Sequence, residues 1–328
     1  MHDNNMTDMY GDRLDFDGEL SSVIDDVARD LNLGAVVSSN LIAVGYEDYN
    51  TKVVTDSGAY VFKIFSKQRS HEEATRCAEI VDAVCRAGIA HPTIHRTSDG
   101  SALYVHSSGL RLIVMDYIDG ESFYDKGTPP NDEQLRKIVR QAVKIDQLDI
   151  HPTYLFDSWA IPNMGWMLDQ TCNHLSEEGL RLSEEAFRRY NAIPIDQLPK
   201  TFVHGDLIKT NVLLGHDGEI HVIDFSVSNI YPRIQEIAVM AANLLFDEKN
   251  GTTVPLRERI NKLIAMYEAE GGELSDIEKQ YAFDYALPGC AMEYMGSVNE
   301  RIKTGDNKEI RYWENLGLEG LREALGTF

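Results

Sequence analysis

The stretch FVHGDLIKTNVLLGHDGEIHVIDF, residues 202–225, decides the fold. Its two short apolar runs, Val212–Leu214 and Ile220–Ile223, flank a glycine-containing turn and predict a β-hairpin. Pairing of these runs would bring Asn211 and Asp224 together at the open end of the hairpin, with Asp206 in the loop that leads into it. A loop carboxylate held by a scaffold is a common position for a general base.

The residue types at this predicted hairpin suit a phosphoryl-transfer site. An amide oxygen and a carboxylate can bind Mg²⁺ while leaving room for phosphate oxygens and water. The spacing H-x-D-x-x-x-x-N, followed by a hairpin and D-F, matches the kinase pattern of catalytic Asp and metal-binding Asn, although Gly205 replaces the arginine of protein kinases. The alternative is that these are ordinary turn and strand-end residues, but the joint pattern argues against it.

HGDLIKTNVL followed by VIDF resembles the aminoglycoside phosphotransferase and choline kinase group of small-molecule kinases. The resemblance covers roughly residues 40 to 250. It implies an α+β, protein-kinase-like bilobal fold that uses ATP and Mg²⁺. It further implies Asp206 as the catalytic base, Asn211 and Asp224 as magnesium ligands, and His204 as a structural support of the loop.

The rest of the chain predicts two lobes. We expect a flexible segment at 1–20, a β-rich nucleotide-binding lobe at 21–118 with one main helix over 69–87, and a larger, mostly helical lobe at 119–328. That third part should hold the catalytic loop, the metal site and the acceptor pocket. A helix over 131–148 should begin after Asn131.

Lys63, in the apolar strand YVFKIF, is the candidate for holding the nucleotide phosphates, because kinases place such a lysine on a strand before a helix. A glutamate of that helix should hold the lysine. Glu72, Glu73 and Glu79 are candidates, and a spacing similar to the family's favours Glu73.

No G-x-G-x-x-G phosphate loop is present, and residues 44–54 take its place, with Gly45 and Asn50 as candidate contacts. The stretch 45–65 is similar to the bacterial homoserine kinases, which carry G-x-E-N-x-N-Y and then T-x-x-G-x-Y-V-L. This chain departs from them at Asp48 and at Lys63, where we expect an uncharged residue in those enzymes.

LIVMDYIDGESF, residues 112–123, resembles the family's hinge between lobes. The backbone of Asp116, Tyr117 and Ile118 would pair with adenine, and Met115 would pack near the base. The alternative is a plain strand followed by a turn. Whether the nucleotide is ATP or GTP is left open.

The C-terminal lobe supplies candidates for the acceptor pocket: Asp157, Trp159, Asp284 and Glu293. Acids and aromatic rings can bind an ammonium group, although the same residues could form helix core and a solvated face. Lys209 could reach the γ-phosphate or be an exposed loop lysine, and we favour the second.

Composition narrows the partners. With 53 acidic and 31 basic residues, the net charge of −22 disfavours nucleic acid and anionic membranes. It favours a cationic acceptor or serves solubility alone. The four cysteines lack zinc spacing and predict free thiols in a reducing compartment. Without a signal sequence or membrane span, we expect a cytoplasmic monomer or homodimer.

Two hypotheses follow. The first is a kinase that transfers the γ-phosphoryl group of ATP to a hydroxyl of a small molecule, with amino alcohols, sugars, aminoglycosides and homoserine all open as acceptors. The second is a catalytically silent, nucleotide-binding relative that acts as an interaction module. The presence of Lys63, Asp206, Asn211 and Asp224 together favours the enzyme.

Overall fold

The computed structural model describes residues 11–43, 48–247 and 254–326. The chain forms two compact units, Met1–Asp119 and Gly120–Phe328, and each is described here by itself. None of the helices within these ranges is long and apolar enough to cross a membrane.

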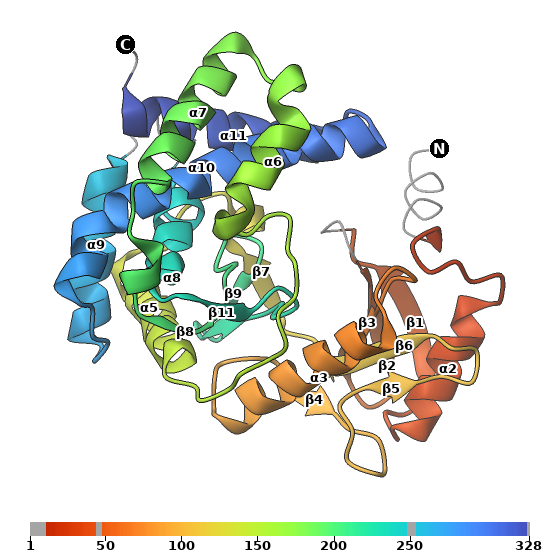
Figure 1. Ribbon diagram of the computed structural model, residues 1–328. Coiled ribbons are helices and arrows are strands. Elements are labelled where there is room, and N and C mark those ends of the chain that lie inside the picture. Colours follow the sequence, from red (N-terminus) through yellow and green to blue (C-terminus); the bar gives the residue numbers. More distant parts are fainter. Residues whose placement is uncertain (1–10, 44–47, 248–253, 327–328) are drawn as a thin grey trace. The chain divides into compact units, whose positions relative to one another are not determined.

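The first unit is built on an antiparallel sheet in the order β1-β2-β3-β6-β4, with β5 also paired to β6 (Figure 1). The strands are β1 (Val36–Leu41), β2 (Tyr49–Thr55), β3 (Ala59–Ile64), β4 (Ile94–His95), β5 (Tyr104–Val105) and β6 (Arg111–Asp116). The predicted turn at 55–58 joins β2 to β3, and the Thr55 hydroxyl accepts bonds from the N–H groups of Ser57 and Gly58. The sheet places Lys63 near the end of a central strand.

Two helices complete the first unit, α2 (Leu20–Asp30) and α3 (His71–Arg86). The core that joins α2 to the sheet includes Val27, Phe62 and Leu112, all at 0% exposure. Leu14, in the segment predicted to be flexible, is buried in the same core, whereas residues 1–10 lie outside the described residues. The predicted main helix is confirmed with slightly narrower bounds.

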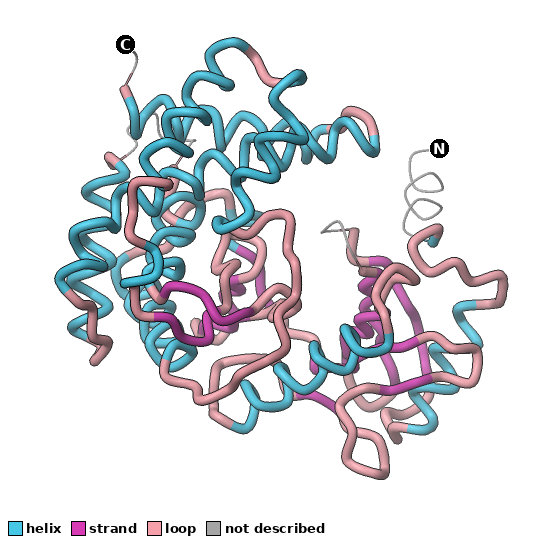
Figure 2. The backbone as a smooth tube through the Cα atoms, in the orientation of Figure 1, coloured by secondary structure: helices cyan, strands magenta, loops and turns pink. Residues whose placement is uncertain are grey.

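The second unit is mostly helical, with its short strands lying among the helices (Figure 2). Its α-helices are α4 (Phe123–Lys126), α5 (Asp132–Asp146), α6 (Met164–Thr171), α7 (Glu177–Tyr190), α8 (Ile234–Val239), α9 (Leu256–Ala269), α10 (Asp276–Thr304) and α11 (Lys308–Leu325). Its shorter turns are η1 (Ile161–Asn163), η2 (Cys172–His174), η3 (Ile195–Gln197) and the π-helical η4 (Met240–Leu244). Asn131 caps α5 as predicted, because its side chain accepts the Gln134 N–H.

The hairpin predicted from the sequence is present as β9 (Val212–Gly215) and β10 (Ile220–Val222). Leu214 pairs with Ile220, and Val212 pairs with Val222. Two features were not predicted: β7 (Gly120–Ser122) extends the hairpin to three strands, and β8 (Lys200–Val203) pairs with β11 (Asn229–Pro232). Both depend on partners distant in sequence, which local patterns do not specify.

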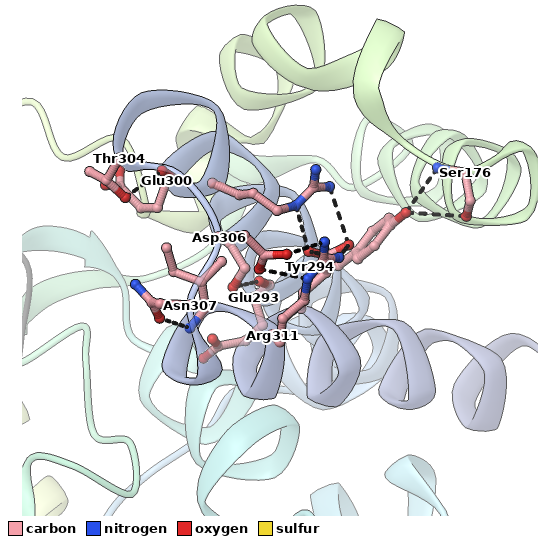
Figure 3. Close-up of polar contacts among 12 residues, drawn as sticks. Ser176, Glu293, Tyr294, Glu300, Thr304, Asp306, Asn307 and Arg311 are labelled. Atoms are coloured by element: carbon pink, nitrogen blue, oxygen red, sulfur yellow. Dashed lines mark hydrogen bonds and ion pairs between the residues drawn. The ribbon is translucent and has the colours of Figure 1, made fainter. Parts of the chain in front are cut away.

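The long helix α10 is fixed by its neighbours α7, α8 and α11. A side chain at Gly317 of α11 would place its Cβ 2.2 Å from the backbone nitrogen of Tyr294, so the close approach of these helices requires glycine. The Tyr294 hydroxyl lies 3.1 Å from the Ser176 nitrogen at the start of α7 (Figure 3). Glu293, beside Tyr294 on α10, is thereby held in a defined position.

Helix α8 supports the loop that follows β8. The Glu236 carboxylate accepts hydrogen bonds from the backbone N–H groups of His204 and Gly205. Glu236 is fully buried. Burial raises its pKa to about 7, against the lowering effect of the two backbone N–H groups.

We predict that Glu236→Ala lowers the free energy of unfolding by about 1–3 kcal/mol, because two N–H groups lose their acceptor. Glu236→Gln keeps an acceptor oxygen. Because the pKa of Glu236 is raised in the folded chain, protonation of Glu236 stabilises the folded state at low pH, and this contribution is lost as pH rises through about 7. Glutamine does not titrate. Between pH 5 and 8 the stability of the Gln variant should therefore increase relative to that of the natural protein. Urea denaturation across that range measures both effects. An Ala variant as stable as the natural protein would contradict the support role.

Candidate active site

The loop from His204 to Asn211 is shaped by its first two residues. His204 is 0% exposed, and its Nδ1 accepts the Asp206 N–H at 3.1 Å while its Nε2 donates to the carbonyl of Ile223 at 3.0 Å. These partners correspond to a neutral ring with its proton on Nε2. Gly205 has a φ of +81°, which favours glycine at that position. The geometry gives His204 contacts with both the loop and the end of the hairpin.

Asp206 and Asn211 are in direct contact. The Asn211 Nδ2 donates to the Asp206 carboxylate at 2.6 Å and to the Asp206 carbonyl at 3.0 Å. Because the amide nitrogen faces Asp206, the amide oxygen of Asn211 is the atom left to bind a cation.

The hairpin brings Asn211 and Asp224 together as predicted. The Ile223 N–H donates to the Asn211 carbonyl at 3.0 Å, which extends the β9–β10 pairing by one step. Asp224 follows directly, with a φ of +64°, a backbone conformation uncommon for a residue other than glycine. Ser226 donates to the Asp224 carboxylate through its backbone N–H and its hydroxyl.

The carboxylate of Asp206 lies in an acidic environment. Burial raises its pKa well above the usual range, and the charges of Glu293, Asp157 and Asp224 raise it further. The hydrogen bond from Asn211 acts in the opposite direction. A raised pKa in a carboxylate that faces a cavity is typical of a general acid or base.

A cavity of about 50 Å³ lies against Asp206. Glu293 and Trp159 also line it, so two of the predicted acceptor residues share one space with the predicted base. The remaining lining residues are Ile161, Gly205, Ile208, Val239, Ala242, Asn243, Gly289 and Met292. The cavity therefore has two acids and the Asn243 amide in its wall, and the rest of the wall is mostly apolar.

Asn243 orients Glu293 within this wall. Its Nδ2 donates to the Glu293 carboxylate, and its Oδ1 accepts the Lys209 N–H at 3.1 Å. Burial raises the pKa of Glu293 to about 7, while Asn243 and the nearby charge of Lys209 lower it. Asn243 belongs to the π-helical turn η4, a distortion frequent at functional sites. The sequence reasoning missed this residue, because nothing in the local pattern marks a π-turn.

The other two acidic candidates differ in their positions. Asp157 accepts the Trp159 N–H at 2.9 Å and raises the pKa of Asp206, so its charge lies near the cavity. Asp284 is not among the cavity's lining residues, and its carboxylate pairs with Arg189 at 2.6 Å. Asp284 and Glu293 are nine residues apart on α10, or about 900° of helical rotation, which places them on opposite faces.

The expectation that Lys209 is an exposed loop lysine is wrong, since only 2% of its surface is exposed. The backbone of Lys209 is bonded on both sides, its N–H to Asn243 and its carbonyl to the Tyr124 N–H. Lys209 therefore belongs to the packed base of the loop.

In the first unit, Lys63 is paired across the β2–β3 ladder with Asn50. Residues directly opposite in an antiparallel ladder present their side chains on the same face. The Lys63 ammonium lies 3.5 Å from the carboxylate of Asp48, a residue that the sequence reasoning noted only as a departure from homoserine kinases. Gly45 lies outside the described residues.

The structure does not place Glu73 against Lys63. The Glu73 carboxylate accepts the Ser70 N–H at 2.7 Å and the Ser70 hydroxyl accepts the Glu73 N–H, which together form a capping box at the start of α3. Glu72 and Glu79 are exposed. Sequence spacing alone could not distinguish a capping glutamate from one that pairs with a strand lysine.

At the predicted hinge, Met115 and Asp116 end β6, and Met115 is buried. The Asp116 N–H donates to Thr93 and the Tyr117 N–H donates to Ala59, so both are used within the first unit. The Asp116 carboxylate contacts His95 Nε2 at 2.8 Å.

Known proteins resemble this chain in sequence and in fold. Residues 39–270 match the model of the phosphotransferase enzyme family. The homoserine kinase of Zymomonas mobilis subsp. mobilis is 24% identical over 289 residues, covering 85% of each chain. The homoserine kinase of Methylobacterium nodulans is 26% identical over 204 residues, covering 60% of this chain and 61% of that protein.

Solved structures share the fold at low identity. A spectinomycin phosphotransferase in complex with ADP and spectinomycin has a TM-score of 0.64 at 12% identity, covering 90% of this chain and 96% of that one. The choline kinase LicA from Streptococcus pneumoniae has a TM-score of 0.63 at 13% identity, covering 93% and 99%. The fold is therefore the α+β, protein-kinase-like fold of small-molecule kinases. With the family match spanning more than half of its length, the chain belongs to the phosphotransferase enzyme family and is a small-molecule kinase.

Proposed function

We propose that the protein transfers the γ-phosphoryl group of ATP, with Mg²⁺, to the hydroxyl of a small molecule that carries an amine. The observation that carries this proposal is the cavity in which Asp206 and Glu293 share one wall, beside the pair Asn211 and Asp224. Relatives in the same family include homoserine kinases, and structures with the same fold contain ADP or AMP-PNP.

In this proposal Asp206 orients the acceptor hydroxyl and accepts its proton. The contact with Asn211 fixes the direction of the Asp206 carboxylate, and the loop is held by His204 and Glu236. The raised pKa of Asp206 makes it a stronger proton acceptor than an ordinary carboxylate.

Asn211 and Asp224 would hold Mg²⁺. The donor set fits, because one amide oxygen and one carboxylate form the partial, oxygen-only shell that this ion completes with phosphate oxygens and water. Among the described residues no group of three or more His, Cys, Asp or Glu is placed to hold a metal, so a larger protein cage is absent there. When bound, the ion would neutralise charge on the transferred phosphoryl group.

In the first unit, Lys63 would hold the nucleotide phosphates, and the hinge backbone would contact adenine. Of the three hinge candidates, Asp116 and Tyr117 use their N–H groups in hydrogen bonds to carbonyl groups within the first unit. The N–H of Ile118 is therefore our candidate donor to the base.

The acceptor is proposed to be small and cationic. The cavity is well below the roughly 300–1,000 Å³ of sites for drug-sized ligands. It is lined by two carboxylates and, among the described residues, by no lysine or arginine. The sequence relatives favour homoserine, whereas the absence of a lining cation favours an amino alcohol without a carboxylate, so both belong in the test.

We predict that Asp206→Ala lowers kcat by about 10²- to 10⁴-fold, because the acceptor hydroxyl loses its proton acceptor. ATP affinity, measured by calorimetry, should stay close to that of the natural protein. Asp217→Ala, an exposed turn residue of the hairpin, is the matched control and should leave kcat unchanged. Transfer at the natural rate by the Asp206 variant would refute the base assignment.

The acceptor is identified by ADP release with homoserine, choline, ethanolamine, simple sugars and aminoglycosides. Release that depends on homoserine or an amino alcohol supports the proposal, and the better of the two names the class. ATP binding without acceptor-dependent release from any of them would favour the catalytically silent relative.

We predict a pH-dependent KM for an amine-bearing acceptor. Since burial raises the pKa of Glu293 to about 7, its carboxylate is mostly neutral at pH 6 and mostly charged at pH 8. KM should therefore fall as pH rises through 7. Glu293→Gln should remove this dependence and raise KM at pH 8 by about 10- to 100-fold, the value of a hydrogen bond to a charged group.

Asp284→Asn is the control for Glu293, because it lies on the opposite face of the same helix and pairs with Arg189. Its KM should follow the natural pH profile. An unchanged KM in the Glu293 variant would show that the ammonium group binds elsewhere.

A further inference from the structure

Asp48 in the first unit lies at the centre of a buried group of charges. Its side chain is only 2% exposed. Oδ1 accepts the Ser66 N–H at 3.1 Å and Arg69 Nε at 3.0 Å, and Oδ2 lies 3.5 Å from Lys63 Nζ. One carboxylate therefore contacts two cations that are themselves nearly buried.

The strand pairing explains why Asp48 reaches Lys63. Asn50 is directly opposite Lys63 in the β2–β3 ladder, and Asp48 precedes Asn50 by two residues. Asp48 lies in the bend that immediately precedes β2. From there its carboxylate reaches the Lys63 side chain.

A buried ammonium group is costly unless it is paired. The Lys63 side chain is 11% exposed, and its contact with Asp48 offsets part of this cost. Arg69 and Ser66 fix the other oxygen of Asp48, so the carboxylate itself cannot easily turn away. The arrangement places a fixed carboxylate within ion-pair distance of the lysine head group.

The helix α3 does not provide this support. Its Glu73 is engaged with Ser70 in the helix cap, and Glu72 and Glu79 face solvent. Glu73, which was expected to pair with Lys63, instead caps the start of α3.

We propose that Asp48 is the residue that positions Lys63 for nucleotide phosphates, in place of a helix glutamate. This inference rests on the proposed function, because it concerns ATP binding by the same protein. In this role Asp48 is a positioning residue that acts through Lys63.

The test is a double-variant cycle in the full chain, read by calorimetry with ATP and Mg²⁺ and without acceptor. Asp48→Asn preserves shape and removes charge, and Lys63→Met removes the ammonium group. Asp48→Asn should weaken ATP binding by about fivefold or more in the natural chain, and by less than about 1.5-fold in the Lys63→Met chain. Asp48→Glu, which restores the charge, should recover part of the affinity.

An equal loss in both backgrounds would mean that Asp48 acts on the fold alone, and no loss would mean that it does not position Lys63. Either result overturns the inference. This readout measures ATP binding without acceptor, so its failure can be distinguished from failure of the proposed function. The proposed function fails if ATP binds but ADP is released with none of the acceptors.

A second variant tests the helix glutamate directly and does not depend on the folding of Asp48→Asn. Glu73→Gln keeps the capping box, since glutamine can serve at that position. It should bind ATP as the natural protein does. A loss of affinity comparable to that of Lys63→Met would restore the helix glutamate as the lysine's partner and refute the role of Asp48.

Discussion

The burial of a carboxylate close to other carboxylates is the constraint on which the site depends. Burial raises the pKa of Asp206 well above the ordinary value, and the charges of Glu293, Asp157 and Asp224 raise it further. Such a group is unfavourable for the folded chain alone and becomes favourable when cations enter it. A metal beside Asp224 and an ammonium group beside Glu293 would each relieve part of this repulsion, so the energetics and the proposed chemistry require the same partners.

The surrounding structure keeps these acids in place. Glu236 holds the start of the loop, His204 joins the loop to the hairpin, and the π-turn presents Asn243 to Glu293. Each of these supports is a buried polar contact, which is worth most when every partner is present. The precision of the site therefore comes from residues that would not touch substrate.

The part of the predicted geometry that the structure confirms, the hairpin, is local in the chain. Asn211 and Asp224 lie at the open end of a short hairpin, whose pairing follows from two apolar runs and a turn. The errors concern side-chain partners. Residue type and spacing predict Glu73 as the partner of Lys63 and Asp284 as part of the acceptor pocket. In the structure Glu73 caps its own helix and Asp284 pairs with Arg189. The prediction of an exposed Lys209 rests on the usual exposure of loops, whereas η4 and α4 bond its backbone. These outcomes depend on tertiary contacts, which a local pattern does not contain.

The net charge of the whole chain likewise does not show how charges are arranged locally. A charge of −22 opposes the binding of any nucleotide. The first unit nevertheless places Lys63 and Arg69 on either side of Asp48, while the second gathers acids around a cavity. Electrostatic interactions weaken within about 8–10 Å in physiological salt, so these local groups outweigh the distant average. A chain can therefore be strongly acidic overall and still present one region suited to phosphate and another suited to an amine.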